Sequence, residues 1–357
     1  MTQTLKHLSE RLQHPEQTTL SATCSSAELL LQLESWVSRG WLRALDRGFA
    51  AFVLELDPQA QPAVVLAAAL VSFQLGRGHS CLDLQATLQA PDTLHHEGDN
   101  ASPVLAGMLT SLDLASWRQA LACSTLVEDQ DSLMRAEQRP LVLAGQRLYL
   151  RRYWNYERNI ARALSLRLQM PASAPDDLAQ RLAELFPEPM LVEGARQTDW
   201  QKVACAIAAR GNFSVLTGGP GTGKTTSVVR LLGLLQSPAV AAGKPLRIRL
   251  AAPTGKAAAR LSESIGKAVS QLQVSDAVRQ SIPAEVSTLH RLLGSRPDTR
   301  NFSHHRDNPL ALDVLVVDEA SMIDAPLMAQ FLSALPDGAH LLIVGDADQL
   351  PSVGPGM

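Results

Sequence analysis

The second half of the chain alternates short apolar runs with longer amphipathic segments. The apolar runs have the length expected of strands that are covered on both faces, and they lie at Phe213–Leu216, Leu246–Ala251, Leu312–Val317 and Leu341–Val344. Helical apolar spacing occurs between these runs, at Thr225–Leu235, Lys256–Leu272 and Ala325–Leu335. This alternation predicts an α/β fold in which a parallel sheet carries helices on both faces.

The first half of the chain has a mostly helical pattern. Ser26–Trp36 and Ala63–Leu75 carry apolar residues at helical spacing, and Ala90–Pro103 has the Asp-, His- and Pro-rich composition of a loop. These patterns divide the chain into three parts: a helical N-terminal domain at 1–110, a connecting segment at 111–195 and an α/β domain at 196–357.

The connecting segment contains a predicted β-hairpin. Two alternating apolar runs in Leu141–Arg152 flank Gly145 and Gln146, which are typical turn residues for such a hairpin. A helix is expected to begin at Asn155 and to end before the proline-containing segment 171–175.

Aromatic and basic side chains gather around the end of this hairpin. They are Tyr149, Tyr153, Trp154 and Tyr156, interleaved with Arg147, Arg151, Arg152 and Arg158. Such a cluster can form a stacking surface for nucleic acid or for a partner subunit. An amphipathic hairpin and helix that pack their aromatic side chains inward give the same pattern, so both interpretations stand at this level.

Composition restricts the class of protein. Apolar residues make up 46% of the chain and charged residues 19%, which indicates packed cores and excludes global disorder. The net charge of −3 neither indicates nor excludes a nucleic-acid binder, because a local basic stripe matters more than the total. The four cysteines form no CxxC pair and are predicted to be reduced structural residues: Cys24, Cys81, Cys123 and Cys205.

No targeting or membrane segment is apparent. The N-terminal residues lack the apolar region of a signal peptide, and the longest mostly apolar run, Ala63–Phe73, is too short to cross a bilayer. We therefore expect a cytoplasmic protein without a membrane partner.

The residues after the Phe213–Leu216 run match the phosphate-binding pattern G-x-x-x-x-G-K-[ST]. Glycines let the backbone curl so that successive N–H groups face one centre at a helix N-terminus, where the helix dipole favours anions. Lys224 is expected to reach the β- and γ-phosphates of ATP, and Thr225 to give its hydroxyl to Mg²⁺. The predicted nucleotide-binding residues are Gly218, Gly219, Pro220, Gly221, Thr222, Gly223, Lys224, Thr225 and Thr226.

Acidic and amide side chains follow two later strands. Asp318 and Glu319 come directly after the Leu312–Val317 run, which we expect to sit beside the phosphate-loop strand. Asp318 is then placed to hold Mg²⁺, and Glu319 to polarise the attacking water as a general base. After Leu341–Val344, Asp346 and Gln349 are expected at the same sheet edge, with Gln349 as a candidate sensor of the γ-phosphate.

Basic residues outnumber acidic ones between residues 244 and 306. The cations are Lys244, Arg247, Arg249, Lys256, Arg260, Lys267, Arg279, Arg291, Arg296, Arg300 and Arg306, against Glu263, Asp276, Glu285 and Asp298. This excess fits a groove that binds a phosphate backbone, and it also fits an ordinary solvated surface. His290 is interpreted as a structural hydrogen-bonding residue rather than a catalyst or metal ligand.

Five segments together are similar to the motifs of superfamily 1 helicases: GGPGTGKTT, APTGKAAARL, STLHRLLG, VVDEASMID and GDADQLPSVG. Their residue sequences resemble those of the RecD family, the alpha subunits of exodeoxyribonuclease V. The resemblance is specific from about Trp200 onward and weaker in RLYLRRYWNYE. It implies a RecA-like motor domain that moves 5′ to 3′ on single-stranded DNA during double-strand-break repair and recombination. It also implies RecB and RecC as partners, with residues 1–110 docking on RecC; no nuclease motif is visible.

The resemblance assigns roles to further residues. It implies that Gln201 contacts adenine and that Asp318, Glu319 and Gln349 act with Lys224 in ATP hydrolysis. The implied DNA-binding residues are Pro253, Thr254, Lys256, Thr288, His290 and Arg291.

The chain ends just after GDADQLPSVG, before the second RecA-like domain of the family. That domain supplies the arginines that complete the ATP site, so we expect this chain alone to bind nucleotide but to hydrolyse it very slowly. Two alternatives remain open at this level: a free-standing RecD-like helicase, and a non-hydrolysing, nucleotide-binding assembly subunit.

Overall fold

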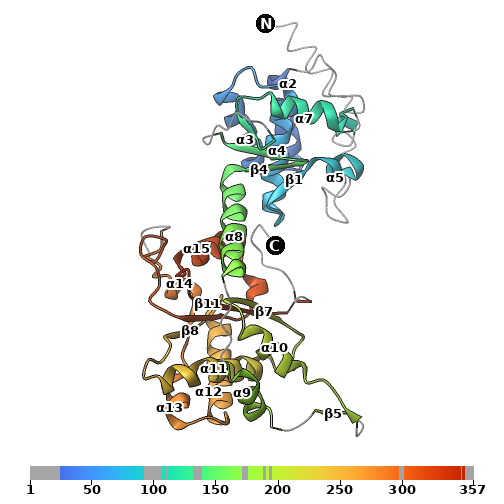
Figure 1. Cartoon of the computed structure of the whole chain (residues 1–357). Helices are drawn as coiled ribbons and strands as arrows, with labels where there is room; N and C mark the ends of the chain where they lie inside the picture. The colour runs from blue at the N-terminus through green and yellow to red at the C-terminus, as the bar shows by residue number, and fades with distance from the viewer. Residues whose placement is uncertain are drawn as a thin grey trace, which may run out of the picture. The chain divides into compact units, whose positions relative to one another are not determined.

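A computed structural model describes residues 25–91, 107–109, 111–131, 139–170, 176–187, 190–192, 195–296, 301–346, 348 and 349. The chain forms two compact units, and the boundary between them lies between Asn155 and Tyr156 (Figure 1). The predicted connecting segment therefore contributes residues to both units. Among the described helices, none has the length and apolar character needed to cross a membrane.

The first unit combines helices with a small sheet. Its helices are α2 (Ser26–Ser38), α3 (Ala44–Leu56), α4 (Pro62–Gly76), α5 (Leu84–Gln89) and α7 (Leu114–Ala122). Its four-stranded sheet has the order β1 (Cys81–Asp83), β4 (Arg147–Leu150), β3 (Leu141–Ala144) and β2 (Val127–Asp129). The two helices predicted in this region are confirmed as α2 and α4, whereas the predicted loop at Ala90–Pro103 lies almost wholly outside the described residues.

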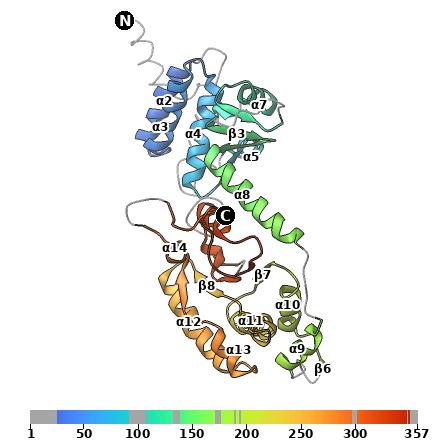
Figure 2. The same cartoon turned by 60° about the vertical axis from the view of Figure 1, so that its left-hand side comes forward.

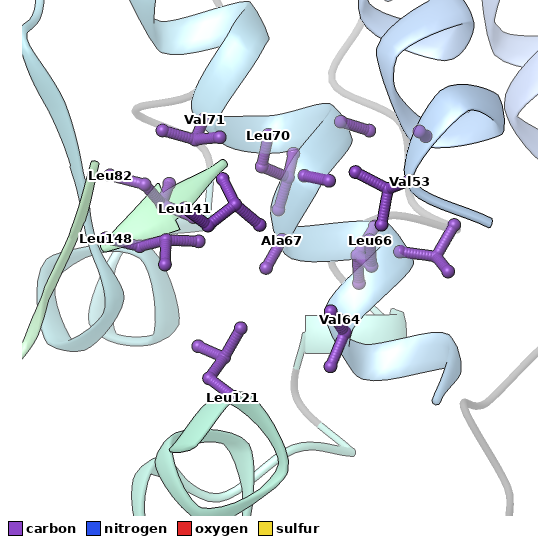
Figure 3. Close-up of a cluster of buried hydrophobic side chains, with 14 of the residues drawn as sticks. Val53, Val64, Leu66, Ala67, Leu70, Val71, Leu82, Leu121, Leu141 and Leu148 are labelled. Carbon is purple, nitrogen blue, oxygen red and sulfur yellow. The ribbon is translucent and has the colours of Figure 1, made fainter. Parts of the chain in front are cut away.

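Helix α4 forms the centre of this unit. All nine residues from Val64 to Ser72 are buried, which is expected of a helix that other elements cover on every side. Figure 3 shows its side chains meeting Val53 of α3, Leu121 of α7 and Leu141 of β3. The unit therefore has its own hydrophobic core.

A buried ion pair joins α3 to α4. The carboxylate of Asp46 is fully buried and accepts hydrogen bonds from the Arg43 guanidinium at 2.6 and 3.0 Å and from the Ser72 hydroxyl at 2.8 Å. Arg43 also donates to the carbonyl of Ser72 at 2.7 Å. A Cβ on Gly76 would lie 2.0 Å from the guanidinium, so the glycine is what lets Arg43 reach this position.

The predicted hairpin is confirmed. Strands β3 and β4 pair antiparallel, with Ala144 opposite Arg147, and Gly145 adopts the left-handed φ of +59° that a tight turn requires. Helix α8 (Arg151–Gln169) follows at once, so the helix expected from Asn155 begins one turn earlier. The first turn of α8 takes up the last two residues that were assigned to the hairpin.

Several members of the aromatic and basic cluster contact other residues of the first unit. Tyr149 is buried and its ring lies 5.1 Å from that of Trp154. Arg151 pairs with the buried carboxylate of Glu128 at 2.6 Å, and Arg147 lies 3.8 Å from Asp83. These contacts favour inward packing over a stacking surface for these residues.

The second unit contains a five-stranded sheet that is parallel throughout. Its strand order is β7 (Phe213–Thr217), β11 (His340–Gly345), β10 (Val314–Val317), β8 (Ile248–Ala252) and β9 (Val286–Thr288). Its helices are the greater part of α8, α9 (Leu178–Leu185), α10 (Trp200–Ala208), α11 (Lys224–Ala241), α12 (Gly255–Ser270), α13 (Asp276–Ser281), α14 (Leu289–Leu292), the short η3 (Ala320–Met322) and α15 (Ala325–Ala334). A short hairpin of β5 (Leu191–Val192) and β6 (Ala195–Arg196) precedes α10.

Helices cover both faces of this sheet, as the sequence predicted. Along β10, Val314 and Val316 pack with α9 to α13, whereas Leu315 and Val317 pack with α14, α15 and α8. In Figures 1 and 2 these two groups of helices lie on opposite sides of the sheet. The α/β fold with a parallel sheet is confirmed.

Two features of the sheet differ from the expectations. Strand β9 is an additional edge strand that its partly polar, three-residue sequence does not reveal. The strand before Asp318 does not sit beside the phosphate-loop strand, because β11 lies between β7 and β10. That neighbour assignment was wrong because sequence order does not fix the order of parallel strands that are joined by helical crossovers.

Candidate nucleotide-binding and nucleic-acid site

Every predicted motif after residue 213 lies at the carboxyl edge of the five-stranded sheet or beside it. Gly345 of β11 pairs with Thr217 of β7, and Val317 of β10 pairs with Ala251 of β8. Ligands bind at this edge of open parallel sheets. The residues that follow these strands are therefore brought together by register rather than by proximity in the sequence.

The loop between β7 and α11 has the backbone of an anion-binding turn. Gly221 and Gly223 adopt left-handed φ values of +76° and +83°, and Gly223 caps the N-terminus of α11. A Cβ on Gly218 would lie 2.9 Å from the hydroxyl of Thr222, which itself donates to the carbonyl of Gly219 at 2.9 Å. Three glycines are thus needed for a turn whose N–H groups converge at a helix N-terminus.

Lys224 and Thr225 begin helix α11. The Lys224 ammonium donates to the carbonyl of Gly219 at 2.9 Å and also to that of Gly218. It is therefore folded back over the loop, where a phosphate group would sit. Thr225 is half-buried beside it, whereas Pro220, Thr222 and Thr226 are exposed.

The side chain of Gln201 reaches this loop from helix α10. Asp199 caps that helix by accepting hydrogen bonds from the N–H groups of Gln201 and Lys202 at 3.0 and 3.1 Å. The Gln201 amide then donates to the carbonyl of Thr222 at 3.1 Å. Its approach depends on Gly223, because a Cβ there would lie 2.3 Å from the amide nitrogen.

Asp318 and Glu319 follow the fully buried strand β10. Burial raises the pKa of the Asp318 carboxyl; the N–H of Glu319 opposes the shift, the Glu319 carboxylate adds to it, and the Lys224 ammonium opposes it. The influence of Lys224 places the loop ammonium and this acid in one electrostatic environment. Glu319 has a φ of +52°, a value that no other non-glycine residue adopts in the described ranges. Such backbone strain concentrates at functional sites.

The end of β11 lies between the phosphate loop and the Asp318 strand. Asp346 is buried there and accepts a hydrogen bond from the N–H of Asp348 at 3.1 Å, while the N–H of Gln349 donates to the carbonyl of Asp346 at 3.3 Å. These bonds form a tight turn that leaves Gln349 exposed.

The donor set suits a hard divalent cation. A threonine hydroxyl and a carboxylate offer the oxygen ligands that Mg²⁺ prefers, and one or two protein ligands are usual when phosphate groups supply the rest. Burial raises the pKa of the Asp318 carboxyl, because desolvation disfavours its negative charge. A cation bound between Thr225 and Asp318 would compensate it, so these residues fit the group.

The two predicted DNA-binding motifs begin at neighbouring points of the same edge. Ala252 of β8 pairs with Thr288 of β9, and each strand leads directly into a helix. Thr254 caps α12 by accepting from the N–H of Ala257 at 3.2 Å, and Thr288 caps α14 by accepting from the N–H of Arg291 at 3.2 Å. Two threonine-capped helix starts therefore lie at one edge, and the N-terminus of the 16-residue α12 is the one that favours a phosphate group.

The basic side chains of this region divide into two groups. Arg247, Lys267 and Arg279 are paired with Asp313, Glu263 and Asp276 at 2.8, 2.6 and 2.5 Å. The counted excess of cations therefore overstates the charge available to a ligand. By contrast, Lys256, Arg260, His290 and Arg291 are exposed, and Pro253 is half-buried. The His290 ring packs edge-on against Phe302 at 5.7 Å, in line with a structural role.

Sequence reasoning missed two residues near the nucleotide loop. Arg230 of α11 lies 3.5 Å from the Gln201 amide oxygen and 4.3 Å from the centre of the Phe186 ring, as measured from its guanidinium. Neither residue belongs to a motif, and no spacing in the sequence points to them.

Comparison with known proteins gives matches in both units. Residues 38–149 match the family described as RecBCD enzyme subunit RecD, N-terminal domain, and residues 201–355 match an AAA domain family. The RecBCD enzyme subunit RecD of Mycolicibacterium smegmatis is 40% identical over 310 residues, 85% of this chain and 49% of that protein. The same subunit of Haemophilus influenzae is 38% identical over 302 residues, 82% of this chain and 46% of that protein.

A RecD2 helicase also matches, over a shorter part of this chain. The ATP-dependent RecD2 DNA helicase of Deinococcus radiodurans is 43% identical over 143 residues, which cover 40% of this chain and 16% of that protein. The chain spans about half the length of the RecD subunits that it matches.

Proposed function

The chain belongs to the RecD family, and from this premise we propose that it carries the ATP-binding part of a 5′–3′ DNA helicase subunit. The subunit would act with RecB and RecC in double-strand-break repair and homologous recombination, in the cytoplasm. The match to the RecD N-terminal domain and the broad coverage by RecBCD subunits favour this function over a free-standing helicase, whose named relative matches a shorter part.

The observation that carries the proposal is the shared sheet edge. The phosphate loop, Asp318, Gln349 and the two threonine-capped helix N-termini all follow strands of one parallel sheet. A motor needs nucleotide and DNA sites on one rigid body so that binding at one can affect the other. A nucleotide-binding assembly subunit needs no DNA site at this edge, so the arrangement favours the motor.

Roles follow for the residues of the nucleotide site. Gln201 would contact adenine, and the N–H groups of the loop would bind the phosphates with Lys224. Thr225 and Asp318 would hold Mg²⁺, which when bound neutralises charge on the phosphate oxygens. Glu319 would orient and deprotonate the attacking water, and Gln349 would contact the γ-phosphate.

Roles also follow for the second site. Pro253, Thr254 and Lys256 would bind single-stranded DNA at the start of α12, and Thr288, His290 and Arg291 would do so at the start of α14. Residues 1–110 would dock on RecC; the match to the RecD N-terminal domain, at residues 38–149, overlaps this part of the chain and supports the proposal.

The proposal is tested with the full-length protein assembled with RecB and RecC. DNA-stimulated ATP hydrolysis is measured together with strand displacement from a duplex that has a 5′ overhang. Lys224→Ala is expected to lower nucleotide affinity on the order of 10- to 100-fold, because it removes charge-assisted contacts to phosphate. Lys256→Ala is expected to weaken DNA stimulation while nucleotide binding stays intact. Full hydrolysis by the Lys224→Ala protein would refute the assignment.

A further inference from the structure

A chain of three side chains leads from the core to the proposed nucleobase contact. Phe186 is buried just after the C-terminal end of α9, and the guanidinium of Arg230 lies over its ring at 4.3 Å. This stacking holds a planar cation in a fixed place. The guanidinium in turn lies 3.5 Å from the amide oxygen of Gln201.

The surroundings allow the Gln201 amide only one orientation. Its nitrogen donates to the carbonyl of Thr222, an acceptor, and its oxygen faces Arg230, which can only donate. A flipped amide would place oxygen against oxygen at Thr222 and nitrogen against the guanidinium. Both neighbours therefore favour the same orientation.

Among the residues that the structure describes, the fixed amide retains one free donor and one free acceptor. A primary amide has two N–H donors and two oxygen lone pairs, and the protein uses one of each. Adenine presents N7 as an acceptor beside the N6 amino donor, whereas guanine presents two acceptors, N7 and O6. An amide fixed in this way complements adenine and leaves its oxygen against an acceptor of guanine.

We propose that Arg230 is a positioning residue that fixes the Gln201 amide and so sets the preference of the site for adenine over guanine nucleotides. The inference rests on the proposed function, in which Gln201 faces the base. Arg230 acts on the nucleotide only through the Gln201 amide, so its effect depends on Gln201.

The test measures nucleobase preference by displacement of a ribose-labelled fluorescent ADP in the presence of Mg²⁺, with ADP and GDP as competitors. Arg230→Met is expected to lower the ratio of ADP to GDP affinity about threefold to tenfold, the value of one net hydrogen bond. Arg230→Lys is expected to retain only part of the preference, because an ammonium is also a pure donor but lacks the planar face that lies over Phe186. The matched control is Arg210→Met, which alters an exposed arginine beyond the other end of α10.

A double-mutant cycle separates positioning from a merely structural effect. In a Gln201→Ala protein, Arg230→Met is expected to leave the ratio unchanged. The inference would be overturned if Arg230→Met lowered the ratio of ADP to GDP affinity equally in the wild-type and Gln201→Ala backgrounds. It would also be overturned if Arg230→Met alone left this ratio unchanged. If the wild-type protein binds ADP and Lys224→Ala does not, the nucleotide site stands whatever Arg230 does. If the wild-type protein binds neither nucleotide, the proposed function and the inference are both refuted.

Discussion

Replacing Gly223 with alanine perturbs two things that the structure allows us to separate. The first is backbone strain, because a left-handed φ of +83° costs an L-residue about 1–2 kcal/mol. The second is steric, because the new Cβ would lie 2.3 Å from the amide nitrogen of Gln201 and 3.2 Å from its Cδ. Gln201 must rotate away and lose its hydrogen bond to Thr222, which adds about 1 kcal/mol.

Gly243 provides the matched control, since it follows the other end of the same helix. Its φ is +72°, and no heavy atom would lie within 4 Å of an added Cβ. Gly243→Ala is therefore expected to cost about 1–2 kcal/mol of unfolding free energy and to leave nucleotide binding unchanged. Gly223→Ala is expected to cost about 2–3 kcal/mol, or about 4–12 °C in Tm for a domain of this size, and to weaken ADP binding.

Chemical denaturation followed by circular dichroism gives the two free energies, and displacement of labelled ADP gives the affinities. Equal stability losses in the two variants, together with unchanged ADP affinity in Gly223→Ala, would refute the steric part of the reasoning. A larger loss in Gly243→Ala would refute the strain estimate as well.

Three further predictions concern stability and reactivity. Burial lowers the pKa of His340 from 6.5 to about 4, so on acidification the unfolded state binds a proton before the folded state does. The free energy of unfolding should therefore fall by about 3 kcal/mol as the pH drops from 6.5 to 4. Urea unfolding at several pH values checks this, because His340→Leu should lack this part of the pH dependence. Asp46→Ala should cost about 2 kcal/mol, since it removes the buried partner of a half-exposed Arg43; a Tm unchanged from wild type would contradict this. Iodoacetamide should label the exposed Cys123 in the native protein but not Cys205, whose thiol pKa burial raises to about 12, as mass spectrometry would show.

Apolar periodicity predicted the elements that bury much surface. Helices α4 and α12 and strands β10 and β11 were predicted to within two residues, because a long periodic or fully apolar segment has few alternative structures. Short elements escaped: β1, β2 and β9 have three residues each, and their pairing partners rather than their own sequences make them strands. Helix α8 begins at Arg151, whose side chain pairs with Glu128, a contact between residues far apart in the sequence that periodicity does not reveal.

The candidate site divides in a similar way. Residues within motifs, such as Lys224, Asp318 and Thr254, could be assigned to one sheet edge because each follows a predicted strand. Arg230 and Phe186 could not, because they reach Gln201 only through the packing of α9 and α11. The excess of basic residues between 244 and 306 also overestimated the available positive charge. Three of these cations form ion pairs with Asp313, Glu263 and Asp276, and only the folded structure reveals these pairs.

The strand order adds an argument that the sequence alone could not supply. If β10 were beside β7, Asp318 would directly follow the neighbour of the phosphate-loop strand, with no element between them. Instead β11 is inserted, and its end places the buried Asp346 and the turn to Gln349 between the loop and Asp318. This turn follows β11, the strand that pairs with both β7 and β10, so a shift of the turn would move residues at both halves of the site. The inserted strand thus brings the turn to Gln349 between the two halves of the proposed site, which supports the proposal that Gln349 contacts the γ-phosphate.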